Sequence, residues 1–332
     1  MKRGASGLSL LVGVKKPLGM SSHDVVNRCR KIFGEKRVGH TGTLDPLAEG
    51  VLPICIGPAT RLDAYMVGHD KEYRVSIRFG YETGTDDAEG EPTAVAPVPA
   101  HLDDLDFAQA FVGSLIGFHD QVPPQYSAIK IDGQTAYKLA RKGQEADLEP
   151  RRIQILDAQI EDVTRDEEGY LIWDARLCVS KGTYIRSIAR DVGRELGSAA
   201  HVARLERIRA GRIYLEQCVS LEALELLKEN AALDPVRVLG VRYAFADDFA
   251  QRVASGASID VDMATLYEAL DPMESEALCT CSSSVAKSEQ PPKDGELIAF
   301  VVGNRLKALY AYAANRCEYK PACVFSVPVF RF

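Results

Sequence analysis

A short glycine-rich stretch, Gly39–Gly50, constrains the fold of this chain more than any other segment. It holds three glycines, one histidine, two threonines and two acids in twelve residues. Asp45 precedes Pro46, and a residue before proline is pushed away from helix toward the extended region. Two interpretations are open: a tight connection in which Asp45 forms an Asx-turn, or a stiff turn that presents the carboxylate outward to a ligand.

Regular elements are expected on both sides of this turn. Ser21 or Ser22 can cap a helix over residues 22–33, in which apolar residues recur on one face. A strand is expected over residues 51–56, followed by a short helix over residues 58–66. The turn therefore connects a helix to a strand.

The composition is that of an ordinary globular protein. The chain has 332 residues, of which 46% are hydrophobic and 26% charged, so we expect about two domains. No segment approaches the roughly 20 apolar residues that span a bilayer. Residues 8–14 are apolar, but the run is short and ends in two lysines and Pro17. We therefore predict a first strand instead of a signal peptide, and a cytoplasmic protein.

Charge is unevenly distributed along the chain. The net charge is −7, yet residues 1–80 hold thirteen Lys and Arg against seven acids, and residues 181–212 hold eight against three. Residues 81–120 hold nine acids and no Lys or Arg. Such segregation permits a basic face that attracts a nucleic-acid backbone, and it is equally compatible with an uneven solvated surface.

Residues 72–79 alternate apolar and polar side chains, which predicts a strand with Tyr73 on its apolar face. Tyr73 is then either a core tyrosine or a ring placed to stack on a base. Beyond it we expect an acidic loop over residues 82–99 and a helix over residues 105–115. Residues 121–134 contain a Pro-Pro pair, and a basic amphipathic piece follows over residues 136–142. This insert is expected to form a mobile flap or a plain helical hairpin.

The remainder of the chain divides into further strands and a small tail domain. A helix is expected to open at residues 180–187, where Lys181 and Arg186 would suit an anion, or would be solvated cations on a capped helix. A boundary is expected near residues 231–239. The strands are expected over residues 153–163, 170–179 and 201–209, and in a β-barrel-like tail over 297–302, 306–312 and 323–329.

Eight cysteines are scattered without a CxxC pair, which indicates reduced thiols instead of a disulfide framework. A metal site could be assembled only from cysteines that lack the usual ligand spacing. These are Cys279, Cys281, Cys317 and Cys323.

Five motifs in order make the chain resemble the TruB family of bacterial tRNA pseudouridine-55 synthases. The longest is the stretch Val38–Pro53, which contains the sequence GHTGTLDPLAEG. The others are Lys16–Ser22, Lys71–Val75, Pro124–Lys130 and Ser180–Arg186. Together these motifs cover residues 8 to about 212.

The resemblance implies an α+β protein with two domains. A pseudouridine synthase catalytic domain, residues 1–235, would carry a largely antiparallel mixed sheet and a thumb insertion at about 122–150. A β-rich, PUA-like RNA-binding domain would follow over residues 240–332. The implied reaction converts the T-loop uridine of tRNA to pseudouridine without an external cofactor or metal, in a protein that is expected to be a monomer.

The resemblance also assigns roles to individual residues. Asp45 would be the essential nucleophile, either adding to the sugar or deprotonating C2′ towards a glycal. Asp45 would have to be ionised, and Arg186 would hold it in place through a charge-assisted bond. Tyr73 would stack on the flipped uracil and assist deprotonation at C5. Tyr184 and the backbone at Leu205 would help form the nucleotide pocket. His40 would contact the RNA where the target base leaves the stack, and Lys16 would support the active-site loop.

Phosphate contacts are expected from basic side chains of the helix and of the thumb, namely Arg28, Arg30, Lys31, Lys36, Lys130, Arg141 and Lys142. Three other readings of the function remain open. The chain could be the catalytic subunit of a guide-RNA-dependent synthase, or a tRNA-folding protein without chemistry. A nucleotide phosphate cradle is the third, although the turn lacks the GKS/T ending of a P-loop.

Overall fold

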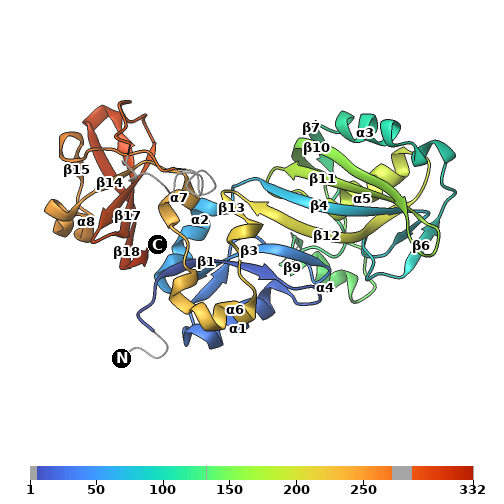
Figure 1. The fold of residues 1–332 in the computed structure, drawn as a ribbon, viewed down its shortest axis with the longest axis horizontal. Coiled ribbons are helices and arrows are strands. Elements are labelled where there is room, and N and C mark those ends of the chain that lie inside the picture. Colours follow the sequence, from blue (N-terminus) through green and yellow to red (C-terminus); the bar gives the residue numbers. More distant parts are fainter. Residues whose placement is uncertain (1–5, 132, 271–285, 332) are drawn as a thin grey trace. The chain divides into compact units, whose positions relative to one another are not determined.

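The computed structural model describes residues 6–131, 133–270 and 286–331. Within them the chain forms two compact units (Figure 1). Unit 1 comprises residues 1–45, 50–67 and 209–332, and unit 2 comprises residues 46–49 and 68–208. No helix in the described part of the chain is both long and apolar enough to cross a lipid bilayer.

The N-terminal part of unit 1 combines three strands with a long helix. Its elements are β1 (Leu10–Lys16), α1 (Ser22–Phe33), β2 (Val38–His40), β3 (Ala48–Ile56), the 3₁₀ helix η1 (Gly57–Leu62) and α2 (Asp63–Met66). Strands β1 and β2 both pair antiparallel with β3. The predicted helix over 22–33 and the strands on either side are confirmed.

The C-terminal part of unit 1 is rich in short strands. Its elements are β13 (Ile213–Tyr214), η3 (Leu215–Gln217), α6 (Leu221–Leu227), η4 (Lys228–Ala231), α7 (Pro235–Leu239), β14 (Tyr243–Phe245), η5 (Asp247–Phe249), α8 (Ala250–Ser255), β15 (Ile259–Asp260), η6 (Val261–Met263), β16 (Leu297–Val302), β17 (Arg305–Ala313), η7 (Ala314–Arg316) and β18 (Glu318–Phe330). The sheet runs in the order β14-β16-β17-β18-β15. The three tail strands expected from the sequence are confirmed as β16, β17 and β18.

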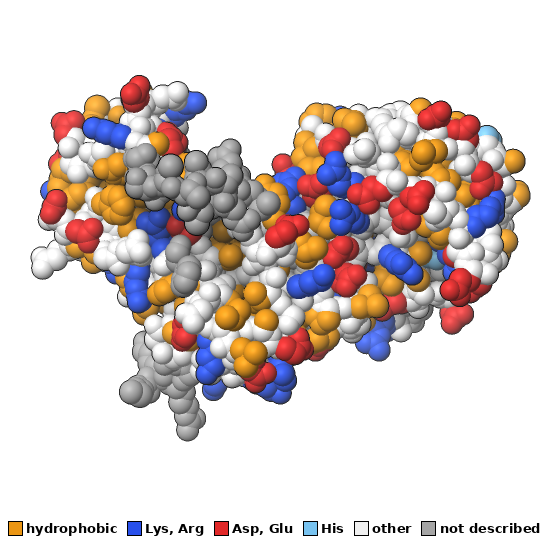
Figure 2. Space-filling view, in the orientation of Figure 1, with side chains coloured by type: hydrophobic (Ala, Val, Ile, Leu, Met, Phe, Trp, Pro, Cys, Tyr) orange, Lys and Arg blue, Asp and Glu red, His pale blue; other side chains and the backbone are white. Residues whose placement is uncertain are grey.

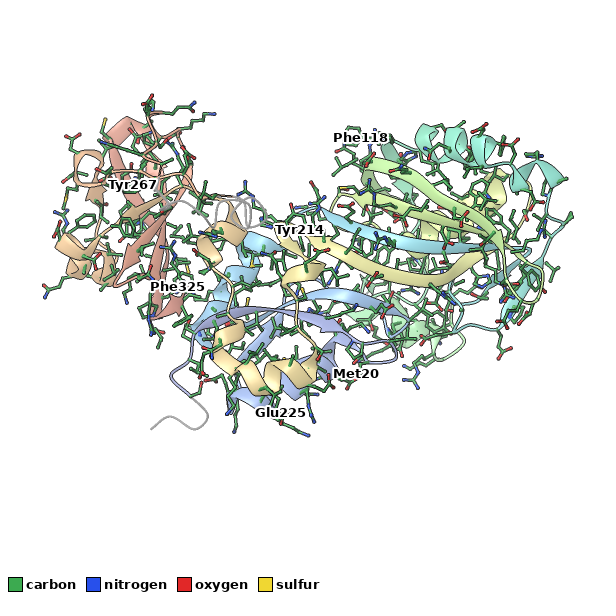
Figure 3. All side chains as sticks on the ribbon, in the orientation of Figure 1. Met20, Phe118, Tyr214, Glu225, Tyr267 and Phe325 are labelled. Carbon is green, nitrogen blue, oxygen red and sulfur yellow. The ribbon has the colours of Figure 1, made fainter. Side chains whose placement is uncertain are left out.

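One apolar core joins the two parts of unit 1. Leu11 and Val51, from β1 and β3, belong to the same buried cluster as Val301 and Phe325, from β16 and β18. Figure 3 labels Phe325 on its strand. The backbone N–H of Phe330 also donates to the Ser9 carbonyl, at 2.8 Å. The N-terminal strands and the tail sheet therefore share buried surface, which stabilises both.

Unit 2 is built on strands that are far apart in the sequence. Its elements are β4 (Lys71–Phe79), β5 (Tyr81–Thr83), β6 (Pro92–Val95), η2 (Ala100–Asp103), α3 (Leu105–Ser114), β7 (Gly117–Gln121), β8 (Lys130–Ile131), β9 (Gln134–Thr135), α4 (Ala136–Ala140), β10 (Arg151–Arg165), β11 (Leu171–Val179), α5 (Ile185–Glu195) and β12 (Ala200–Ala210). The main sheet has β12, β4, β11, β10 and β7 side by side in that order (Figure 1).

The sheet of unit 2 has one buried face and one polar face. Tyr73, Val75, Ile77 and Phe79 alternate inward on β4 and are all less than 9% exposed, as the sequence predicted. The opposite face is charged, with acidic and basic side chains interspersed (Figure 2). Strand β7 forms the edge, where Phe118 is 60% exposed (Figure 3). The antiparallel pairing and the covering helices give the α+β fold class that the sequence indicated.

The loop predicted over residues 82–99 is wrong in part. Strands β5 and β6 pair antiparallel, and the turn between them buries two acids, Asp86 and Asp87. Asp87 forms a parallel bridge with Val202 of β12, and the Val202 N–H donates to the Asp86 carbonyl at 3.1 Å. Burial of charged residues was not expected here, and it requires charged or hydrogen-bonding partners.

Candidate active site

In unit 1, helix α1 fixes the turn that carries Asp45. Ser21 caps the helix in a capping box with Asp24. The next residue, Ser22, is buried, and its hydroxyl both donates to the Leu44 carbonyl and accepts from the Leu44 N–H, each at 2.8 Å. Both backbone groups of Leu44 are thereby held one residue before Asp45. The half-buried Asp45 follows in an irregular segment that leads into β3.

Lys16 and His40 end two strands of unit 1, β1 and β2, that both pair with β3. Lys16 lies at the end of β1 and is fully buried, and its ammonium donates to the carbonyls of Pro17 and Met20 at 2.8 and 2.6 Å. It therefore ties down the loop that leads into α1. His40 ends β2, opposite Ile54 of β3, and is half buried.

In unit 2, the predicted substrate residues lie on the main sheet and at the start of α5. Tyr73 on β4 and Leu205 on β12 are each 8% exposed. Tyr184 is the N-cap of α5, and Gln121 holds its backbone on both sides. The Tyr184 N–H donates to Gln121 Oε1 at 2.9 Å, and Gln121 Nε2 donates to the Tyr184 carbonyl at 3.0 Å.

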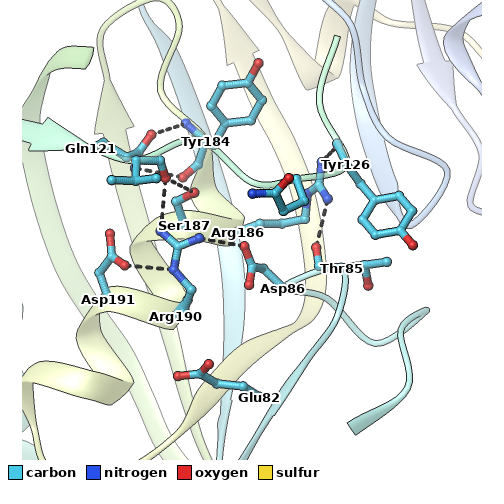
Figure 4. A network of polar contacts seen from close by, with 12 residues as sticks. Glu82, Thr85, Asp86, Gln121, Tyr126, Tyr184, Arg186, Ser187, Arg190 and Asp191 are labelled. Carbon is cyan, nitrogen blue, oxygen red and sulfur yellow. Dashed lines mark hydrogen bonds and ion pairs between the residues drawn. The ribbon is translucent and has the colours of Figure 1, made fainter. Parts of the chain in front are cut away.

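Arg186 is buried in the first turn of α5, with only 4% of its surface exposed. Its Nη1 donates to the Thr85 carbonyl at 2.8 Å and lies 3.5 Å from Oδ2 of Asp87. Its Nη2 donates to the Tyr126 carbonyl at 2.9 Å (Figure 4). The predicted bond from Arg186 to Asp45 would join the two units and stays a prediction.

A second arginine of α5 completes the network and was missed from the sequence. Arg190 Nη1 lies 2.9 Å from Oδ2 of Asp86, and its Nε lies 2.9 Å from Oδ1 of Asp191. Its Nη2 donates to the Val122 carbonyl at 3.0 Å, and the Ser187 hydroxyl donates to the same oxygen at 2.9 Å (Figure 4). The sequence did carry one signal for this pairing, the charge pattern. Residues 81–120 hold acids and no Lys or Arg, residues 181–212 are basic, and segments of opposite charge are expected to form ion pairs.

Burial shifts the proton equilibria of two charged groups near these residues. Burial raises the pKa of Asp86, and the neighbouring Arg190 and Arg186 oppose that rise. Burial lowers the pKa of Lys71, at the start of β4, to about 8, and the positive charge of Arg207 adds to the effect. Both shifts mark unit 2 as a place where charge is held away from water.

Metal ligation finds no support in the part of the chain that the structure describes, where no group of three or more His, Cys, Asp or Glu side chains could hold an ion. Two of the four cysteines named above, Cys279 and Cys281, lie outside the described residues. Cys317 is exposed and Cys323 is buried, both as free thiols.

Two family models match the chain. One is described as the N-terminal domain of the TruB family pseudouridylate synthases and matches residues 30–185. The other is described as the tRNA pseudouridylate synthase B C-terminal domain and matches residues 186–276.

Curated relatives named tRNA pseudouridine synthase B also match the chain. The protein from Syntrophotalea carbinolica is 45% identical over 214 residues, which is 64% of this chain and 68% of the relative. The protein from Symbiobacterium thermophilum is 45% identical over 239 residues, or 71% of this chain and 77% of the relative.

The fold is also found in solved structures of RNA–protein and protein complexes. A structure titled as an H/ACA RNP bound to a substrate RNA containing 2′-deoxyuridine has a TM-score of 0.61 and 21% identity, over 97% of this chain and 84% of that one. A Cbf5-Nop10-Gar1 complex gives the same TM-score at 23% identity, over the same shares of both chains. The two family models define the class of protein, the pseudouridylate synthases. Within that class, the chain belongs to the TruB family.

Proposed function

We propose that this protein isomerises uridine 55 in the T loop of tRNA to pseudouridine. The observation that carries the proposal is the 45% identity to proteins named tRNA pseudouridine synthase B. In the reaction the C1′–N1 glycosidic bond breaks, the uracil turns, and a C1′–C5 bond forms. The reaction is an isomerisation, so it balances without a redox partner.

Three residues would perform the chemistry. Asp45 would act on the sugar from a turn whose backbone Ser22 fixes, because a reacting group gains most when it is held in place before the substrate arrives. Arg186 would hold the Asp45 carboxylate in place through a charge-assisted bond. Tyr73 would stack on the extruded uracil and assist the loss of the C5 proton. Extrusion costs a few kcal/mol, which stacking and phosphate contacts offset.

Contacts to the RNA would come from both units. Tyr184 and the backbone at Leu205 would help form the nucleotide pocket. His40 would contact the RNA where the target base leaves the stack, and Lys16 would support the active-site loop. The thumb, about residues 122–150, would close over the T stem-loop. The expected phosphate contacts are exposed in six cases (Arg28, Lys31, Lys36, Lys130, Arg141 and Lys142), and Arg30 is half buried.

The tail would form a second, RNA-binding domain. We propose a catalytic domain over residues 1–235 and a PUA-like domain over residues 240–332. The strand-rich sheet β14–β18 fits a small β domain of this kind. We further propose that the protein works as a monomer in the cytoplasm, where tRNA is modified.

A T-arm stem-loop RNA tests the function directly, with no metal or nucleotide added. We expect the wild type to form pseudouridine and Asp45→Asn to lose at least about a thousandfold in rate while still binding RNA. Glu49→Gln is the matched control, because Glu49 lies in the same stretch and has no assigned role. Because uridine and pseudouridine have the same mass, the product is measured by chemical labelling of pseudouridine.

The outcomes separate the competing functions. Full activity of Asp45→Asn would remove that residue from the nucleophile role. Tight RNA binding by the wild type without product would favour a tRNA-folding protein. Product that appears only when a guide RNA and a ribosomal target are supplied would favour the guide-dependent synthase, which is the alternative suggested by the H/ACA-like fold.

A further inference from the structure

Two arginines on α5 make parallel sets of contacts. Arg186 and Arg190 are four residues apart and so lie on the same face of the helix. Among its contacts, each guanidinium reaches one acid of the β5–β6 turn and one backbone carbonyl of residues 121–126. Arg190 joins Asp86 to the Val122 carbonyl, while Arg186 approaches Asp87 and donates to the Tyr126 carbonyl. We call the first set the outer rung and the second set the inner rung.

The acid side of both rungs is fixed to the sheet. Asp86 adopts a left-handed backbone conformation, with φ of 61°, which aspartate tolerates better than most residues. Its carbonyl accepts from Val202 of β12, and the Ala88 N–H donates back to the Val202 carbonyl at 2.9 Å. The Thr83 hydroxyl holds the Asp87 carbonyl at 2.6 Å. Hydrogen bonds therefore hold the backbone that carries the Asp86 and Asp87 carboxylates in a fixed position.

The carbonyl side of both rungs is the root of the thumb, residues 121–126. Beyond this root the thumb has a small apolar core of its own, formed by Ala136, Ala146 and Leu148, and separate from the core of the sheet. A lobe with its own core can move as one body if its root acts as a hinge. The contacts to the Val122 and Tyr126 carbonyls therefore lie at the hinge about which the thumb would move.

We infer that Arg190 is a positioning residue, which fixes the thumb root to α5 through the outer rung and so keeps the inner rung in place. The inference rests on the proposed function, in which the thumb closes over RNA and Arg186 serves the nucleophile. Because Val122 and Tyr126 belong to one short segment, freeing the first carbonyl lets the second drift away from Arg186. Arg190 thereby couples closure of the thumb to the position of Arg186.

The competing interpretation is that the ion pair between Arg190 and Asp86 serves only the fold and has no effect on the thumb. Its burial alone does not decide between the two, because a buried ion pair is weak evidence for net stability. Arg190→Lys separates the two. Lysine keeps a positive charge for the buried carboxylate of Asp86, but its single ammonium cannot hold both that acid and the Val122 carbonyl in the arginine geometry. Ser187→Ala is the second variant, because it removes the other bond to the same carbonyl and changes no charge.

Arg194→Gln is the matched control. Arg194 lies one turn further along α5 and pairs bidentately with Glu82, at 2.7 Å for both bonds, so its loss breaks an ion pair on the same helix without touching the thumb root. Two readouts are used for all variants. The first is the single-turnover rate at saturating T-arm RNA, and the second is limited trypsin cleavage at the exposed thumb sites Lys130, Lys138, Arg141 and Lys142.

We expect Arg190→Lys and Ser187→Ala to lower the single-turnover rate about tenfold, since small misplacements of reacting groups are costly. We also expect faster thumb cleavage in the free protein, weaker protection by RNA, and a melting temperature close to that of the control. Wild-type rates and cleavage patterns in both variants would overturn the inference. So would a loss of activity that follows melting temperature alone.

Failure of the proposed function would look different. If the wild type forms no pseudouridine, the isomerase proposal fails whatever the variants do. The thumb cleavage of free Arg190→Lys and Ser187→Ala, compared with Arg194→Gln, still decides whether the outer rung holds the root.

Discussion

Gly90 shows how a single residue can constrain the polar network of unit 2. A Cβ added at this position would lie 2.8 Å from the Thr85 amide nitrogen and would collide with the Thr85 hydroxyl. Thr85 is the residue whose carbonyl accepts from Arg186. The glycine therefore allows the β5–β6 turn to close tightly beneath that arginine.

We expect Gly90→Ala to destabilise the protein by about 1–3 kcal/mol, since overpacking forces the backbone to move. The same movement should lower the pseudouridine-forming rate about tenfold. Gly84→Ala is the control in the same turn, because its Cβ would meet nothing closer than 3.7 Å. Urea unfolding and single-turnover kinetics measure both effects, and equal behaviour of the two variants would contradict the steric argument.

At the scale of secondary-structure elements, helix α1 connects its own cap to the aspartate turn. Ser21 and Ser22 are adjacent, but their hydroxyl groups bond to different segments. Ser21 accepts from the Asp24 N–H and serves only the helix, whereas Ser22 satisfies both backbone groups of Leu44. Substituting each serine separately distinguishes helix stability from turn geometry.

We expect Ser22→Ala to cost about 1–3 kcal/mol, because it leaves buried N–H and C=O groups unsatisfied. Its rate should fall tenfold or more, since the backbone before Asp45 is released. Ser21→Ala should cost about 1 kcal/mol of stability and leave the rate unchanged. Identical rates in the two variants would show that the turn does not depend on Ser22.

Elements with local signals were predictable, and contacts between distant segments were not. The cap and apolar spacing of α1 lie within twelve residues, so its bounds, Ser22–Phe33, follow from the sequence. The inward position of Tyr73 follows from alternation along one strand. The pairing of Arg190 with Asp86 spans 104 positions, and neither residue carries a local sign of it. The short β5–β6 pair is likewise too brief and too acidic to show periodicity.

At the scale of the whole molecule, the shared core of unit 1 ties the tail sheet to the N-terminal strands. Phe325 belongs to that core together with Leu11 and Val51. Phe300, on β16 of the same sheet, belongs instead to a second cluster built only from residues of the tail, among them Tyr310 and Tyr319. Substituting each phenylalanine therefore tests whether the tail sheet is stabilised independently of the N-terminal strands.

We expect Phe325→Ala to cost about 3–5 kcal/mol and to speed amide hydrogen exchange in β1 and β3 as well as in β18. Phe300→Ala should cost a similar amount and speed exchange in the tail sheet alone. Exchange in β1 and β3 that is unaffected by Phe325→Ala would show that the tail is stabilised independently of the N-terminal strands.

The equal spacing of the arginines and of their carbonyl acceptors in the two rungs limits which insertions and deletions the gene can tolerate. The two arginines and the two carbonyl acceptors are each four positions apart, so the segment from Val122 to Tyr126 can neither gain nor lose a codon without breaking one contact. The β8–β9 pair takes part in neither set of contacts. Length variation among chains built this way should therefore accumulate at β8 and β9 and be absent from the root of the thumb.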